Sequence, residues 1–303
     1  MTWRLLSDQR AFLVAGRTLV MQVAHPVVGA GVRDHSDFRA DPWARLDGTL
    51  RSLNRLVFAP EEKAMAEGVR LRKMHRAITG VDANGRPYRA LDPDAYLWVH
   101  ATLWEGAVAM CSWFGRPLTG DERERFYQEW REIGRRLGIA ARRLPTTSVM
   151  FGEYIDDVID RELTRTAAVD EVLGTIAHPT SPLPLGIAHP LWDAAVMPAG
   201  HVLHVVTVGT LPHPLRRRLG LRWSPAHEIE LRTVAASVRT GWPVLPAWLR
   251  RSPAAQRLSA RNGNSARTDA TRAASTSATR TVSTADAATR VSPNGSTIAV
   301  SPA

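Results

Sequence analysis

Helix-start signals recur along the chain and constrain its fold more than any other feature. Asp41 and Asp92 each precede a proline, so a capping carboxylate stands before a residue that suits the first helical position. Thr119 opens a capping box of the form Thr-Gly-Asp-Glu, and Ser224 precedes another proline. No segment alternates apolar and polar residues as strands joined by hairpin turns do. The sequence therefore predicts an all-α fold, a single multi-helix bundle with short connecting loops.

Apolar periodicity and these start signals together predict the helix positions. We expect helices near residues 8–24, 42–58, 60–78, 93–115, 120–138, 148–168, 190–210 and 225–240. Between residues 79 and 92, Gly80, Gly85 and Pro87 indicate a loop.

Composition changes near residue 257. Residues 258–303 are almost wholly Ser, Thr, Ala, Arg, Asn and Gly, with no aromatic residue. Such a segment cannot bury enough apolar surface to offset its ordering entropy. We therefore expect one domain over residues 1–257 and a disordered tail over 258–303. An alternative role for this tail is a basic tether for anionic lipid or a partner.

The net charge of +10 is concentrated at the carboxyl-terminal end. From Arg250 onward there are eight arginines against Asp269 and Asp286, which leaves the remainder only mildly basic. Its charges do not gather with aromatic residues as they would along a nucleic-acid groove. The sequence therefore predicts no nucleic-acid partner.

Two long apolar stretches, residues 11–32 and 187–211, raise the question of a membrane span. Arg17 interrupts the first and Asp193 the second, which makes a lipid-facing helix costly and favours buried core helices. Cys111 is the only cysteine, so no intramolecular disulfide forms. The amino-terminal segment is a poor signal peptide. We expect a cytoplasmic protein, with peripheral membrane association as the less favoured alternative.

Two histidines stand where they could meet across a pair of helices. His75 lies near the end of one predicted helix, and His100 lies about two turns into the next. If the helices fold back antiparallel, both imidazoles reach similar height and could hold a flat macrocycle. His100 shares a predicted helix face with Tyr96, Leu103, Ala107, Met110 and Phe114. Taken alone, that stripe is more typical of an ordinary buried face with a satisfied core histidine.

Other histidines are weaker candidates. His25 precedes Pro26 at a helix junction, where it could cap backbone carbonyls or face the site, and we favour the structural or supporting role. His201 and His204 could bind a metal on one helical face, but no neighbouring ligand in the sequence completes that site.

Five separated blocks carry a resemblance to a known family. They are Gln22-Val-Ala-His-Pro26, Arg72-Lys-Met-His75, Trp98-Val-His-Ala-Thr102, Pro190-Leu-Trp192 and Gly220-Leu-Arg-Trp-Ser224. In this order, over roughly residues 8 to 255, the chain resembles the catalytic domain shared by the fungal oxygenases of mycophenolic acid biosynthesis (MpaB-like) and the bacterial latex-clearing rubber oxygenases.

The resemblance implies a haem b cofactor. It matches His100 to the proximal iron ligand, with Trp98, Thr102, Leu103 and His25 as neighbouring cofactor-binding residues. Histidine ligation can leave the opposite face of the iron open to dioxygen.

The resemblance also implies a distal motif of arginine, lysine and threonine. Arg72 keeps the arginine, whereas His75 replaces the lysine and Arg76 the threonine. As catalytic residues, His75 could hydrogen-bond dioxygen or coordinate the iron, and the arginines could stabilise an oxyanion or pair with haem propionates. The alternative for both arginines is a solvated helix face.

The function implied is a haem-dependent oxygenase that uses dioxygen on a small hydrophobic organic substrate, with oxidative C=C cleavage as one outcome. A haem-binding sensor or carrier, or an inactive protein of the same fold, is the alternative. A helical di-iron carboxylate enzyme is disfavoured because Glu-x-x-His occurs nowhere in the sequence.

Overall fold

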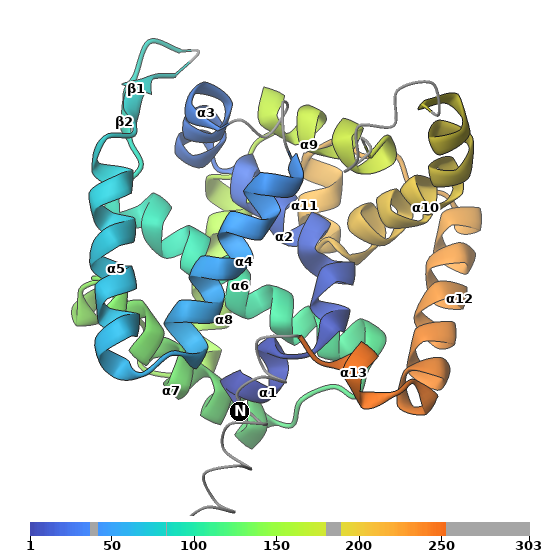
Figure 1. Cartoon of the computed structure of the whole chain (residues 1–303). Helices are drawn as coiled ribbons and strands as arrows, with labels where there is room; N and C mark the ends of the chain where they lie inside the picture. The colour runs from blue at the N-terminus through green and yellow to red at the C-terminus, as the bar shows by residue number, and fades with distance from the viewer. Residues whose placement is uncertain (37–41, 83, 180–188, 253–303) are drawn as a thin grey trace, which may run out of the picture. The chain divides into compact units, whose positions relative to one another are not determined.

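Helices account for most of the chain that the computed structural model describes, which is residues 1–36, 42–82, 84–179 and 189–252 (Figure 1). The amino-terminal half contains α1 (Thr2–Leu6), η1 (Gln9–Val14), α2 (Ala15–Ala24), α3 (Pro26–His35), α4 (Pro42–Phe58), α5 (Glu61–Arg76), β1 (Thr79–Val81), β2 (Pro87–Arg89) and α6 (Pro93–Phe114). The remainder contains α7 (Gly120–Arg136), η2 (Ala141–Arg143), α8 (Ser148–Arg161), α9 (Ala167–Ala177), α10 (His189–Thr210), α11 (His213–Arg218), α12 (Pro225–Gly241), η4 (Trp242–Val244) and α13 (Ala247–Arg250). The predicted all-α class is confirmed.

The predicted start signals lie at the ends of real helices. The Asp92 carboxylate accepts hydrogen bonds from the backbone N–H groups of Asp94 and Ala95 at the start of α6. Thr119 forms its capping box with Glu122, and the Ser224 hydroxyl caps α12. Pro42 begins α4, whereas Asp41 lies outside the described residues.

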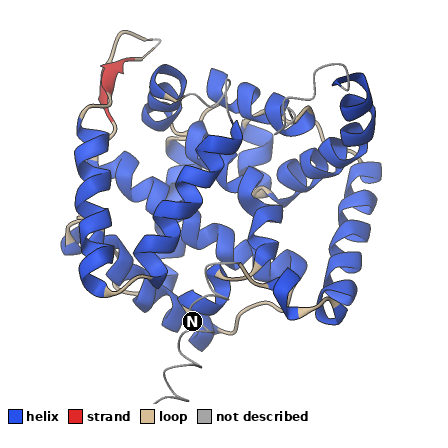
Figure 2. Cartoon of the chain, in the orientation of Figure 1, coloured by secondary structure: helices blue, strands red, loops and turns tan. Residues whose placement is uncertain are grey.

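Several segments differ from the sequence prediction. The helix expected over 8–24 is the 3₁₀ segment η1 followed by α2, and helices α1, α3, α11 and α13 were not predicted. The helix expected over 148–168 is two helices, because the Thr166 hydroxyl accepts from the Val169 N–H and starts α9 separately. The loop expected over 79–92 contains the antiparallel hairpin β1–β2, with Gly80 opposite Tyr88 (Figure 2). The buried Tyr88 donates a hydrogen bond to Asp34 at 2.8 Å, so the end of α3 fixes this hairpin.

Helix α6 is the central element of the core. Helices α2, α7, α8 and α12 and the turn η1 all pack on it, and buried residues occur around its whole circumference rather than on one stripe. The largest fully buried aromatic side chains come from α6, α7 and α8; they are Trp98, Trp104, Trp130, Tyr127, Phe114, Phe126 and Phe151. Five of these rings, Trp104, Phe126, Tyr127, Trp130 and Phe151, contact one another where α6, α7 and α8 meet.

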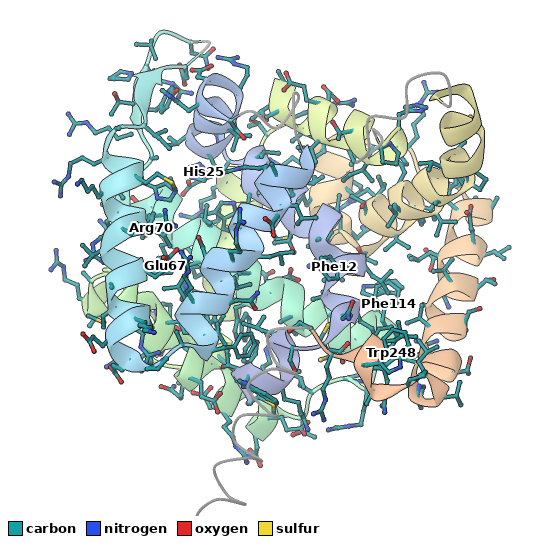
Figure 3. All side chains as sticks on the ribbon, viewed as in Figure 1. Phe12, His25, Glu67, Arg70, Phe114 and Trp248 are labelled. Carbon is teal, nitrogen blue, oxygen red and sulfur yellow. The ribbon has the colours of Figure 1, made fainter. Side chains whose placement is uncertain are left out.

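Buried charges on the other helices are paired. Arg17 of α2 forms an ion pair with Glu105 of α6 and donates from Nε to the Thr210 carbonyl of α10 at 2.8 Å. On α5, the buried Glu67 accepts from Arg70 and from Arg55 of α4, so it joins the two helices (Figure 3). These pairings hold α2, α6 and α10 together, and α4 against α5.

Within the described ranges, no single helix has both the length and the apolar character needed to cross a bilayer. One pair, Gln9–Ala24 with Pro26–His35, meets the length and composition criteria jointly but bends by 104° between its two parts. The tail predicted over residues 258–303 lies outside the described residues, as does the domain boundary predicted at 257.

Candidate active site

His100 is a fully buried histidine in the middle of α6, and neither of its ring nitrogens has a hydrogen-bond partner. Buried polar atoms without partners are rare in folded proteins, because each loses its hydration without compensation. This imidazole therefore costs stability where it stands and is a strong candidate for a functional group.

Helix α7 encloses the His100 ring. The Trp130 ring stacks on it with centroids 4.9 Å apart and planes 12° from parallel, and the Trp130 indole N–H donates to the His100 carbonyl at 3.1 Å. One turn further, a Cβ at Gly134 would lie 2.9 Å from His100 Nε2, so only glycine lets the ring approach this closely. Phe151 of α8 closes another side, with its centroid 6.4 Å away.

Burial in this aromatic surrounding lowers the pKa of His100 to about 3. Ionisation is unfavourable because no carboxylate or carbonyl faces the ring within hydrogen-bonding distance. The imidazole is therefore neutral at physiological pH and keeps a free nitrogen lone pair. Neutral imidazole is the form in which histidine ligates metals.

His75, at the end of α5, lies against α6 one turn before His100. Its ring is 5.9 Å from that of Tyr96, which precedes His100 by four residues. His75 Nδ1 is 2.7 Å from the Leu71 carbonyl, an arrangement that makes Nδ1–H the donor and leaves Nε2 unprotonated. Burial, opposed by that hydrogen bond and helped by nearby Arg45 and Arg70, lowers the pKa of His75.

The two arginines of the predicted distal motif differ in position. The Arg72 guanidinium donates to the Arg136 carbonyl at the end of α7, at 3.1 Å, and lies close to both Gly68 and Gly138. Arg76 is exposed at the last turn of α5. Arg72 therefore faces inward and stabilises the end of the helix that encloses His100, whereas Arg76 faces solvent.

The remaining predicted residues of α6 are close to His100 in sequence, but Trp98 and Thr102 contact α2, whereas the His100 ring contacts α7 and α8. Trp98 is buried and donates from Nε1 to the Met21 carbonyl of α2 at 2.9 Å. Thr102 accepts from Gln22 at 3.0 Å and donates to the Val99 carbonyl. Leu103 is partly buried against the core. These side chains lock α6 against α2, which fixes the height of His100.

His25 stands at the corner between α2 and α3 (Figure 3), and its Nε2 lies 3.1 Å from Glu162 Oε2 at the end of α8. Its Nδ1 is buried without a partner. Burial lowers the pKa of His25, with Glu162 acting in the opposite sense. The predicted structural role at a helix junction agrees with this geometry.

The structure thus groups His75 and His100 along one stretch of α6, with Arg72 nearby, and leaves Arg76 on the surface. Three residues at these sites were not predicted from the sequence. Trp130 and Gly134 contact His100, and Glu162 contacts His25, each from 30 or more residues away. Trp130 and Gly134 share one face of α7, the only sequence signal that could have linked them.

Among the described residues, no three histidine, cysteine or carboxylate side chains gather as a metal site. His201 pairs with Glu230 at 3.0 Å on the surface, a partner that the sequence did not reveal. A haem supplies four ligands to its own iron and needs only one or two from the protein. The absence of a three-residue metal site among the described residues is therefore compatible with haem binding.

Comparisons with known proteins agree with the resemblance described above. Residues 3–240 match the family "ER-bound oxygenase mpaB/B'/Rubber oxygenase, catalytic domain". Two similar relatives are uncharacterised proteins of Mycobacterium bovis and Mycobacterium tuberculosis, each 26% identical over 245 residues, which cover 78% of this chain and 91% of the relative. No solved structure matches this chain.

Proposed function

This chain belongs to the family of the ER-bound oxygenases MpaB/B′ and the rubber oxygenases, and from that premise we propose that it is a haem b-dependent oxygenase acting with dioxygen on a small hydrophobic substrate. The observation that carries the cofactor is His100, a neutral, buried imidazole with both nitrogens unpartnered. Ligation to a haem iron would give this imidazole the partner that it lacks in the described structure.

The chemistry of the donors fits a haem. His100 would be the proximal ligand, and His75 would offer Nε2 from the neighbouring helix. His100 Nε2 packs against Gly134, so ligation through this nitrogen requires the ring to rotate or α7 to shift. Bound haem iron would supply the means to activate dioxygen.

The residues around His100 have three tasks in this proposal. Trp130 stacks on the His100 ring and donates to the His100 carbonyl, so it fixes the backbone from which the ring projects. Trp104, Phe126 and Phe151 keep water from the site, which suits an apolar substrate. Burial raises the pKa of the Tyr96 hydroxyl, and Arg72 is close enough for its charge to oppose that rise. Because the His75 ring also lies against Tyr96, Arg72 places positive charge near His75. An oxyanion or a haem propionate would be stabilised there. Oxidative C=C cleavage is the outcome that the rubber-oxygenase relationship suggests.

A second candidate function is a haem-binding sensor or carrier. It is favoured by the position of His75, whose ring lies against Tyr96, four residues before His100, because this second neutral imidazole would be a further donor to a bound haem. Such a protein would bind haem without an open position for dioxygen.

The test is a haem titration of the full-length chain, with absorption spectra of the oxidised, reduced and carbon monoxide-treated forms. Wild type should develop a Soret band at one haem per chain, and His100→Ala should lose it. His201→Ala, on the surface, is the matched control and should behave as wild type. Carbon monoxide binding by the reduced protein, with substrate-dependent consumption of dioxygen, supports the oxygenase. Haem retained without carbon monoxide binding selects the carrier.

Absence of a stoichiometric Soret band in wild type would refute the cofactor, as would unchanged haem binding by His100→Ala. The His75→Ala variant then separates the two functions. An oxygenase keeps its haem in this variant, whereas a protein with two histidine ligands changes to a five-coordinate spectrum.

A further inference from the structure

A run of apolar side chains at the end of the described chain faces solvent. Residues 243, 244 and 246–249, Pro-Val and Pro-Ala-Trp-Leu, are all exposed. Val244 is 81% exposed and Trp248 is 63% exposed. Phe12, on the adjacent η1, adds a ring that is 44% exposed (Figure 3). Contiguous exposed apolar residues of this kind typically mark a surface that binds a membrane or another protein.

This surface is held in place by the amino-terminal segment. Ser252 N–H donates to the Ser7 carbonyl at 2.7 Å, and the Gln9 side chain donates to the Arg251 carbonyl at 3.1 Å. The Arg10 guanidinium lies over the Trp242 ring, 5.4 Å from its centroid, and also donates to the Phe114 carbonyl at 2.7 Å. The residues on both sides of the apolar run, Trp242 and Arg251–Ser252, are therefore held against the amino-terminal segment, so the run between them has a defined position.

Most charges beside this surface are positive; the Asp8 backbone pairs with that of Arg251, but the Asp8 carboxylate is neutralised in an ion pair with Arg10. Arg250 and Arg251 follow the apolar run directly, and residues 242–252 contain no acidic side chain. Residues 253–303 add six arginines against two aspartates. An exposed tryptophan beside arginines is the composition of proteins that lie in the headgroup region of an anionic bilayer, where the ring is half-immersed and the cations meet phosphates.

We propose that the surface formed by Phe12, Val244, Trp248 and Leu249, with Arg250 and Arg251, docks this protein peripherally on an anionic lipid bilayer. The proposal is independent of the haem assignment.

Two other occupants fit less well. The chain's own residues 253–303 contain no aromatic residue, only five large aliphatic ones, and a net positive charge that would repel Arg250 and Arg251. A second copy docked through the same surface would oppose the same arginines. Of the three occupants, only an anionic bilayer combines an apolar interior for the exposed side chains with negative charge for the arginines.

The test is co-sedimentation of the full-length protein with vesicles of phosphatidylcholine alone or of equimolar phosphatidylcholine and phosphatidylserine. Wild type should bind the anionic vesicles and bind the neutral ones roughly fivefold more weakly for each arginine engaged. Val244→Ser and Trp248→Ala should each weaken binding about tenfold through lost apolar immersion. Ile229→Ser is the matched control, because Ile229 is 67% exposed on α12 and lies outside this surface, and it should bind as wild type.

Three results would overturn the proposal. One is no vesicle binding by wild type, and a second is binding that ignores the phosphatidylserine content. The third is a concentration-dependent dimer that the Val244→Ser variant abolishes, which would assign the surface to contacts between copies. Because Val244 is largely exposed, its serine variant should fold as wild type, and equal thermal unfolding of the two proteins checks this.

Discussion

Replacing His100 by leucine should stabilise the haem-free protein, more so in acid. Leucine has a similar volume and leaves no unpartnered nitrogen. Each unsatisfied buried polar group costs about 1–3 kcal/mol, whereas losing the ring stack on Trp130 costs about 0.5–1.5 kcal/mol. At neutral pH we therefore expect His100→Leu to be at least as stable as wild type.

The pH dependence provides the sharper measurement. The folded pKa of His100 is about 3 and the unfolded value is 6.5, so the unfolded state takes up a proton first as the pH falls. Wild-type stability is then unaffected by this group above pH ~6.5 and declines from there towards pH ~3. At about pH 5 the difference is roughly 1.5 pH units, or about 2 kcal/mol.

Urea unfolding of haem-free wild type and His100→Leu at about pH 7.5 and about pH 5 measures both effects. The lowered pKa values of His25 and His75 act in the same direction but remain in the variant, so they cancel in the difference. His201→Gln, with a more than half-exposed ring, is the control. The reasoning fails if His100→Leu loses as much stability as wild type between the two pH values. A variant that is measurably less stable than wild type at neutral pH would also contradict it, since this would mean that the imidazole has a partner.

Three further substitutions test the surroundings of the site by urea unfolding. Gly134→Ala should destabilise by about 1–3 kcal/mol, because its Cβ would meet His100 Nε2 at 2.9 Å; an unchanged midpoint would show that the ring moves freely. Arg72→Ala should cost about 1 kcal/mol through the lost bond to the end of α7, whereas the exposed Arg76→Ala should stay within about 0.5 kcal/mol; equal effects would contradict the structural role. Glu67→Gln should cost about 2 kcal/mol at neutral pH and progressively less as the pH falls from about 4.5 towards 2, because the pKa of Glu67 is about 2; a constant loss would refute the ionic contribution.

Features encoded within a few residues could be predicted from the sequence. The starts of α6, α7 and α12 depend on Asp92, Thr119 and Ser224 acting on backbone groups two or three residues away, so all three were correctly predicted. The break between α8 and α9 was missed although the Thr166 cap on Val169 is local, because the contact that fixes Thr166 in place is its hydrogen bond to the Val23 carbonyl, 143 residues earlier. A contact of that range leaves no local pattern.

The candidate site divides in the same way. Spacing and resemblance identified His75 and His100, and the structure brings them to one stretch of α6. Their functional roles stay predictions. The residues that determine the state of the His100 ring, Trp130 and Gly134, lie on a different helix, and their importance depends on how α6 and α7 pack. Hydrophobic periodicity predicts that α6 and one face of α7 are buried but not which of their side chains meet.

The corner at His25 constrains how this chain can vary in length. Glu162 meets the His25 ring, Thr164 N–H donates to the Ala24 carbonyl, and the Thr166 hydroxyl donates to the Val23 carbonyl. These three contacts, made by every second residue of the 162–166 loop, fix the register of that loop against the end of α2. An insertion or deletion within that loop would shift every later contact out of register, whereas the exposed tip of the β1–β2 hairpin can gain or lose residues without disturbing the core.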